Sequence, residues 1–178
     1  VNSSSNLPVT ATAATATVTL TAKNKGLGGN EIDLRLNYQG SSSGEAVPAG
    51  LTLTLTQMAS GATNPTLDTA LANLGDEPFD FIVCPYTDTA SLNALKNLLN
   101  DKTGRWSYAN QVYGHVFAAQ RGTVSTLSTA GNARNNQHET IMGFYNSPSP
   151  AWIWAADMAG TAAVALRADP GRPLQTLT

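Results

Sequence analysis

The stretch DFIVCPYTDT, residues 80–89, decides how the second half of this chain is interpreted. It begins within a largely apolar run, residues 79–84, which is typical of a strand buried on both faces of a parallel sheet. It ends in Asp88 and Thr89, residue types that commonly begin a helix. We therefore predict a strand-to-helix corner, at the carboxyl end of a strand, where α/β proteins usually bind their ligands.

The sequence around this corner alternates helix and strand patterns. Helices are expected over residues 64–75, 89–100, 123–130 and 150–167, and strands over residues 79–84, 112–118 and 139–145. In the first helix, Asn64 is the expected N-cap, Pro65 the first helical residue and Gly75 the C-terminal stop. Because each parallel strand needs a crossover, residues 61–178 are predicted to form an α/β domain with a mainly parallel sheet flanked by helices.

The first 60 residues follow a different pattern, in which Thr alternates with Ala, Val and Leu. Three strands are predicted from period-two alternation, in ATATVTLTA (14–22), EIDLRLNY (31–38) and LTLTLTQM (51–58). The glycines of KGLGGN predict a hairpin turn between the first two strands. We therefore expect a small antiparallel β domain over residues 1–60.

Composition and charge limit the classes of function. The 178 residues are 42% hydrophobic, enough for a core, but only 12% are charged and the net charge is -2. No basic field is present to hold nucleic acid or an anionic membrane. No apolar window or signal peptide predicts membrane insertion. A single Cys excludes an intrachain disulfide and is consistent with synthesis in a reducing cytoplasm. The first residue, Val, and the extended final stretch PLQTLT suggest a fragment of a longer protein.

The corner itself offers two candidate catalytic residues. Cys84 could act as a nucleophile and Asp88 as a general base. However, neither His115 nor His138 falls in a recognisable nucleophile–base pattern, so a buried structural thiol is the favoured interpretation of Cys84. Asp88 directly precedes the expected helix, and Ser91 follows three residues later, so we expect Asp88 to be the N-cap.

Other motifs for chemistry are missing or ambiguous. The two histidines have no Cys or acidic partner at metal-ligand spacing, and no Ser nucleophile elbow, phosphate-binding glycine motif or close carboxylate pair is found. Arg105, Trp106 and Tyr108 could form a recognition patch or a lid over the edge of the sheet. We therefore predict no catalytic, cofactor-binding or metal-binding residue and no cofactor.

Four stretches together resemble the tail sheath proteins of contractile-tailed phages, especially the Mu-like group. They are AKNKGLGGNEIDLRL (22–36), similar to the sheath hairpin; PFDFIVCPYTD (78–88), similar to the central strand and its turn; ETIMGFYNSPSPAWIWAADMAG (139–160), similar to a strand followed by an alanine-rich helix; and ADPGRPLQTL (168–177), similar to the close of that helix. The last stretch is the most specific. Within it, we expect Arg172 to bond local carbonyls or Asp169 rather than a neighbouring subunit.

The resemblance implies a structural subunit of the virion whose core is sometimes labelled subtilisin-like but has no protease activity. It implies a polymer of sheath subunits around a tail tube, joined to a baseplate, that assembles in the bacterial cytoplasm and contracts to drive the tube through the host envelope. In the family, terminal arms link neighbouring subunits. We expect these arms to lie outside this chain, so that it does not form tubes alone, and we expect the Thr-rich β domain to decorate the outer surface of the sheath.

Alternatives remain open at this point. A phage sheath, the sheath of an R-type bacteriocin and that of a type VI secretion system are not separated by one core, although a phage or prophage is favoured. An α/β hydrolase-like enzyme would use Cys84, Asp88 and a histidine. A carbohydrate-binding or adhesin module would use the Thr-rich strands.

Overall fold

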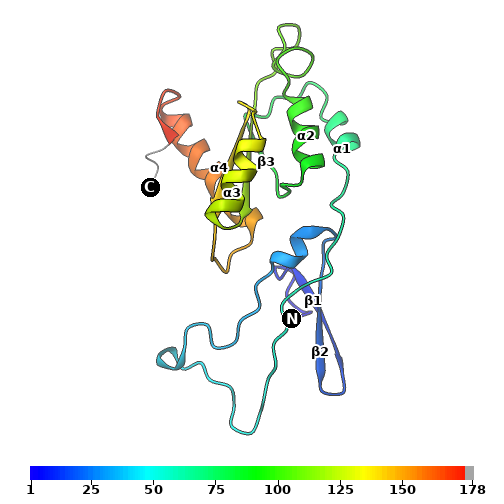
Figure 1. The fold of residues 1–178 in the computed structure, drawn as a ribbon, viewed down its shortest axis with the longest axis vertical. Helices are drawn as coiled ribbons and strands as arrows, with labels where there is room; N and C mark the ends of the chain where they lie inside the picture. The colour runs from blue at the N-terminus through cyan, green and yellow to red at the C-terminus, as the bar shows by residue number, and fades with distance from the viewer. Residues whose placement is uncertain (175–178) are drawn as a thin grey trace. The chain divides into compact units, whose positions relative to one another are not determined.

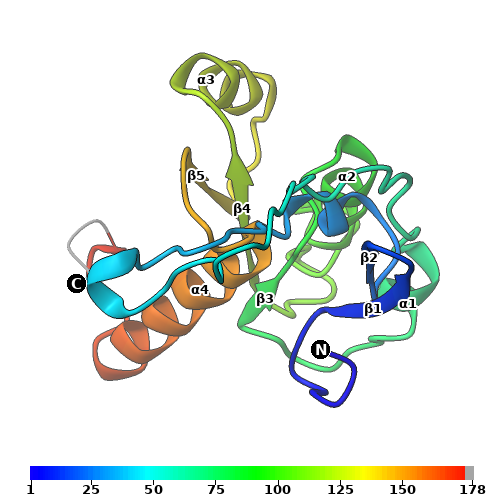
Figure 2. The same cartoon turned by 90° about the horizontal axis from the view of Figure 1, so that it is seen from below.

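The computed structural model describes residues 1–174 of the chain. The chain divides into two compact units, one formed by residues 1–63 and one that begins at Asn64. Figure 1 shows the helices and strands in chain order, and Figure 2 shows them from below. Each unit has its own set of internal contacts.

The second unit contains a parallel sheet of three strands. These are β3 (Phe81–Val83), β4 (His115–Arg121) and β5 (Glu139–Phe144), in the order β3-β4-β5. The helices are α1 (Asp68–Ala72), α2 (Thr89–Leu98), α3 (Val124–Ala133) and α4 (Ala151–Ala168). Helix α2 connects β3 to β4 and α3 connects β4 to β5, as parallel pairing requires. The predicted α/β fold class is confirmed.

Strand β4 lies in the middle of the sheet and contacts apolar side chains on both faces. Val116 and Ala118 belong to the cluster formed with the leucines of α2, whereas Phe117 and Ala119 contact the alanines of α4. Successive side chains of a strand point to opposite faces, so α2 and α4 cover opposite faces of the sheet. The core therefore has three layers, helix, sheet and helix.

Helix α4 packs on the sheet through alanines. Five of them are at most 8% exposed, namely Ala151, Ala155, Ala159, Ala162 and Ala165. They recur every three or four residues, which places them on one face of the helix. Their small side chains let the helix approach the sheet closely, while Trp154 packs at one end against Phe144. The helix expected over residues 150–167 is therefore confirmed, and it packs on the sheet.

Two details of the helix predictions are wrong. Helix α1 begins at Asp68 rather than beside Asn64, and its N-terminus has no side-chain cap. The Asn64 side chain instead donates a hydrogen bond to Asp88, 24 residues away, so that long-range contact replaces the predicted cap. Helix α3 was expected to end at residue 130 but continues through Gly131 and ends at Ala133.

The first unit contains a two-stranded antiparallel sheet of β1 (Val9–Ala14) and β2 (Thr17–Ala22). The prediction of one strand over residues 14–22 is wrong, because the chain turns at Thr15 and Ala16, with Thr15 in the left-handed region at φ 52°. The alternation of Thr with apolar residues continues through both strands and the turn. Its period of two therefore does not reveal where the hairpin reverses.

The predicted strands at residues 31–38 and 51–58 do not form. A 3-10 helix, η1 (Leu27–Glu31), ends where the first was expected to begin, and a second, η2 (Ser41–Ser43), lies between the two segments. Residues 36–39 form a bend and a turn, residues 51–58 have no regular secondary structure, and the two segments lack backbone pairing with each other. Alternation predicts which side chains share a face, but it does not supply a neighbouring strand at pairing distance.

The contact between α4 and the sheet generates the first testable prediction. Ala155 is fully buried, so Ala155→Leu should push α4 away from the sheet and lower the free energy of unfolding by about 1–3 kcal/mol. Exposed Ala156→Leu is the matched control and should change it by less than about 0.5 kcal/mol. Urea unfolding followed by circular dichroism measures both. Equal effects of the two substitutions would contradict the packing described here.

Candidate functional site

The corner after β3 holds Cys84 in a protected position. Its side chain is 3% exposed, its backbone N–H donates to the carbonyl of Phe117 at 2.9 Å, and its thiol donates to the carbonyl of Tyr86 at 3.2 Å. Burial raises the pKa of the thiol above its usual value; the Tyr86 contact opposes this by a smaller amount, and the charge of Asp88, the weakest of the three influences, raises the pKa. The thiol therefore stays protonated at neutral pH and is a poor nucleophile.

Asp88 is occupied by structural hydrogen bonds. Its carboxylate accepts from the backbone N–H of Ser91 at 3.0 Å, from the Ser91 hydroxyl at 2.9 Å and from the side chain of Asn64. Partial burial would raise the pKa of Asp88, but these hydrogen bonds together lower it below its usual value. The prediction that Asp88 is the N-cap of α2 is confirmed.

The histidines lie at the other end of the sheet. His115 begins β4 opposite Phe81, and His138 immediately precedes β5. Cys84 is three residues beyond Phe81, a rise of roughly 10 Å along the strand. Burial lowers the pKa of His115, with a smaller contribution from His138, and the ring of His115 bonds the Thr140 hydroxyl at 2.8 Å. The arrangement required by a hydrolase-like enzyme, Cys84 beside a histidine, is therefore not formed.

An aromatic and polar cluster covers the end of the sheet where the strands begin. Buried His138 bonds the carboxylate of Asp101 at 2.8 Å and stacks on Trp106, with ring centroids 4.5 Å apart. The indole of Trp106 donates to the carbonyl of Gly114 at 2.8 Å. Of the two interpretations of this segment, the lid over the sheet edge fits Trp106, whereas Tyr108 is 92% exposed and takes no part.

Buried Arg105 fixes the segment that contains Trp106. It is 6% exposed, and its guanidinium donates to the carbonyls of Gly75 at 2.7 Å and of Glu77. Gly75 follows α1 in the left-handed region, at φ 51°, as expected of the helix stop. Arg105 therefore fastens the segment after α1 to the segment that covers the sheet edge. Among the described residues, its Nε is a buried side-chain nitrogen with no hydrogen-bond partner.

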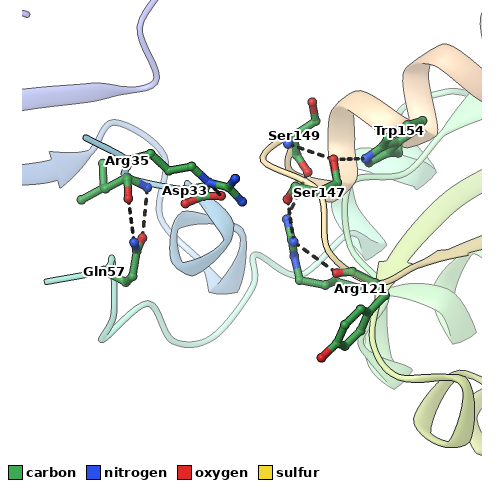
Figure 3. Close-up of polar contacts among 9 residues, drawn as sticks. Asp33, Arg35, Gln57, Arg121, Ser147, Ser149 and Trp154 are labelled. Carbon is green, nitrogen blue, oxygen red and sulfur yellow. Dashed lines mark hydrogen bonds and ion pairs between the residues drawn. The ribbon is translucent and has the colours of Figure 1, made fainter. Parts of the chain in front are cut away.

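Two further arginines fasten loops of the sheet. Arg134 makes two bonds to Glu139, at 2.5 and 2.8 Å; although burial opposes ionisation of Glu139, this contact helps to lower its pKa. Arg121 donates to the carbonyls of Ser147 at 2.7 Å and Ser149 at 3.1 Å and thereby holds the loop between β5 and α4 (Figure 3). These contacts were missed by sequence reasoning because the partners carry no motif and meet only in the fold.

The turn after α4 differs in detail from the expectation. The backbone N–H of Arg172 donates to the carbonyl of Asp169 at 3.1 Å, and that of Gly171 donates to the Asp169 carboxylate at 3.0 Å. In residues 1–174, no hydrogen bond from the Arg172 guanidinium to Asp169 or to a carbonyl is observed, so the predicted side-chain bond is not seen. Residues 175–177 of the stretch ADPGRPLQTL lie outside the described residues.

Metal and membrane sites are not found in the described part of the chain. Residues 1–174 contain no group of three or more His, Cys, Asp or Glu side chains placed to hold a metal ion. None of their helices combines the length and the apolar character needed to cross a bilayer. Among the residues singled out in the sequence, Cys84, Asp88 and Trp106 are part of the packing and hydrogen bonding of the α/β unit.

Comparison with known proteins identifies relatives over nearly the whole chain. Residues 60–178 match the family model of the phage tail sheath protein central domain. The chain is also 42% identical, over 177 residues, to the Mu-like prophage FluMu tail sheath protein of Haemophilus influenzae. That alignment covers 99% of this chain and 35% of the relative, so the chain spans about a third of the length of the relative.

The state of the thiol generates a second prediction. Because Cys84 is buried and its pKa is raised, iodoacetamide at about pH 7 should alkylate it on the order of a hundredfold more slowly in the folded chain than in urea. Mass spectrometry of timed samples measures the rate. Modification of the folded chain at the rate seen in urea would contradict a buried thiol and would favour the enzyme interpretation.

The N-cap generates a third prediction, with a defined dependence on pH. Asp88→Ala should lower the free energy of unfolding by about 1 kcal/mol at neutral pH. Since the folded pKa of Asp88 is lowered, its ionised form stabilises the fold above the unfolded pKa, and this contribution is lost as the pH falls through the folded pKa.

The control for this prediction is Asp88→Asn, which keeps an acceptor but has no charge to titrate. The difference in stability between the unmodified chain and Asp88→Asn should therefore shrink as the pH falls from about 6 to 3, as urea unfolding would show. A difference that stays constant over this range would mean that the charge of Asp88 contributes nothing to the cap.

Proposed function

This chain belongs to the phage tail sheath protein family, and from that premise we propose that it is part of a contractile sheath subunit that polymerises around a tail tube. The observation that carries the proposal is the match to the sheath central domain over residues 60–178, extended by 42% identity to a prophage sheath protein across both units. Contraction of the polymer would drive the tube through the host envelope.

The fastening of loops in the α/β unit supports such a role. A subunit that moves during contraction must keep its own shape while its contacts with neighbours change. Here Arg105, Arg121 and Arg134 each tie a loop to the unit through carbonyls or a carboxylate. These contacts favour movement as a rigid body, with rearrangement confined to surfaces between subunits.

The state of the corner after β3 also fits a structural role. Cys84 is buried with a raised pKa, and Asp88 caps α2, so neither is free to act on a substrate. We therefore infer that this part of the subunit is not enzymatic, needs no cofactor and works through neighbouring sheath subunits, the tail tube and the baseplate. A phage or prophage tail, assembled in the bacterial cytoplasm, is preferred over a bacteriocin or secretion sheath because the relative is named as a prophage protein.

The two units suggest that each forms a different part of the sheath. Residues 61–178 would form the sheath core, and residues 1–60 a small domain on the outside of the sheath. The separate compact unit of residues 1–63 supports this division, as does the exposed Thr-rich sheet β1-β2, because a polar and exposed sheet tolerates solvent. The side of the sheath on which the small domain lies is part of the proposal.

Immunogold electron microscopy of intact phage particles tests the function and generates the fourth prediction. Antibodies against residues 64–178 should label the tail along its length, and the labelled length should shorten when the sheath contracts. Antibodies against residues 1–63 should label intact, uncontracted tails. Labelling confined to the tail tip or the capsid would overturn the sheath assignment, while labelling by the second antibody only after disruption would overturn the outer position.

Two controls separate the alternatives. Labelled tails attached to DNA-filled capsids indicate a phage, whereas labelled tails without capsids in every preparation indicate a bacteriocin-like particle. The purified chain of residues 1–178 is the second control, because we propose that the linking arms lie outside it and that it forms no tubes. Regular tubular polymers of this chain by itself would contradict that part of the proposal.

A further inference from the structure

Two segments in the first unit that form no strand, residues 34–38 and 53–57, are joined at one end by a side-chain amide. The amide of Gln57 accepts a hydrogen bond from the backbone N–H of Leu34 at 3.0 Å and donates one to its carbonyl at 2.7 Å (Figure 3). Asn30 makes the same pair of bonds to the backbone of Gly61, at 2.7 and 3.0 Å. In both contacts, a side-chain amide occupies the place of a peptide group on a neighbouring strand.

The two amide contacts define one antiparallel register. Leu34 lies four residues after Asn30, and Gln57 lies four residues before Gly61, so the two contacts have the same antiparallel offset, although Asn30 itself lies in η1. The N–H and the C=O of Leu34 point toward the same side, as they do at a hydrogen-bonded pair of an antiparallel sheet. The next such pairs in this register are Leu36 with Leu55 and Tyr38 with Leu53.

The pattern of residue types agrees with this register independently of the contacts. Directly opposite residues share a face of the sheet, and a shift by one residue exchanges the faces. The register places apolar residues together on one face, in the pairs 36/55 and 38/53, and polar residues together on the other, in the pairs 35/56, 37/54 and 39/52. A shift by one residue would place each leucine of LTLTLT opposite a polar side chain.

The structure shows these segments unpaired beyond the amide contact. Leu36, Tyr38, Leu53 and Leu55 are 43–60% exposed, and the two segments diverge into a long loop (Figure 1). Asn37 interrupts the first segment in the left-handed region, at φ 51°, where its carbonyl accepts from Gly40 at 3.0 Å. Asn visits this region more readily than most residues, and it can return to the extended region without strain.

We propose that residues 34–39 and 52–57 close into an antiparallel ribbon with Leu36 opposite Leu55, through a change of Asn37 from the left-handed to the extended conformation. In the closed ribbon, the backbone of Gln57 replaces its own side-chain amide as the partner of Leu34. Closure pairs backbone groups at positions 36, 38, 53 and 55 and brings four exposed apolar side chains into cross-strand contact. The structure shows residues 34–39 and 52–57 in the open form. The proposal does not depend on the sheath function.

Disulfide trapping in the full chain tests the register and is the fifth prediction. Leu36→Cys with Leu55→Cys places two cysteines directly opposite, within the range of Cα separations that a disulfide spans, whereas Leu36→Cys with Leu53→Cys places them diagonally and beyond it. Under mild oxidation, the first pair should cross-link about tenfold faster or more. Peptide mapping distinguishes these cross-links from any that involve native Cys84.

Substitution of Asn37 tests the hinge in the background of the first cysteine pair. Asn37→Val disfavours the left-handed conformation because of its branched side chain and should speed cross-linking, while Asn37→Gly accepts that conformation and should slow it. Identical cross-linking rates for the two cysteine pairs would overturn the register. Identical rates for the two Asn37 variants would overturn the hinge.

Amide hydrogen exchange in the unmodified chain gives a test that does not depend on the folding of variants. In the closed ribbon, the N–H groups of Leu36, Tyr38, Leu53 and Leu55 face the opposite strand and should exchange more slowly than those of Asn37 and Thr54, which face away. Equal and rapid exchange at all six positions would overturn the proposal even if cross-links form.

Discussion

Strand β4 is buried on both faces, and the α/β unit depends on this double burial. Val116 and Phe117 are at most 2% exposed, and full burial of such side chains is worth about 1.5–3 kcal/mol each. Val116 contacts the leucine side of the core and Phe117 the alanine side. A large side chain of the sheet thus lies against small side chains of α4, which allows close packing without a cavity.

The double burial also explains why the polar contacts gather at the edges of the sheet. In residues 1–174 the sheet has three strands, and polar contacts hold the loops at its ends. Arg105 and Arg121 donate hydrogen bonds to loop carbonyls, and Arg134 binds the carboxylate of Glu139. Most of these contacts use backbone carbonyls, which can be satisfied without a second buried charge. A chain with few charged residues therefore uses several of them internally.

Local signals were sufficient to predict much of the α/β unit. The N-cap at Asp88 and the strand β5 follow from residue types within a few positions, and the structure confirms both. The contact of Asn64 with Asp88 and that of Asp101 with His138 were not predictable, because they join residues 24 and 37 positions apart through the fold. In the first unit, alternation did not reveal where the chain reverses or which segments pair, because Thr alternates with apolar residues through the turn at Thr15 and Ala16 as well as through the strands.

The corner after β3 shows how a position typical of active sites can serve a scaffold instead. A catalytic corner needs a polar group whose bonding capacity is left for the substrate. At this corner, the carboxylate of Asp88 accepts hydrogen bonds from the first turn of α2 and from Asn64, which lies at the start of the unit. Those bonds fasten the chain entering α1 to the helix that covers the sheet. The contacts that occupy the candidate catalytic acid thus also join two segments of the unit that are 24 residues apart in the sequence.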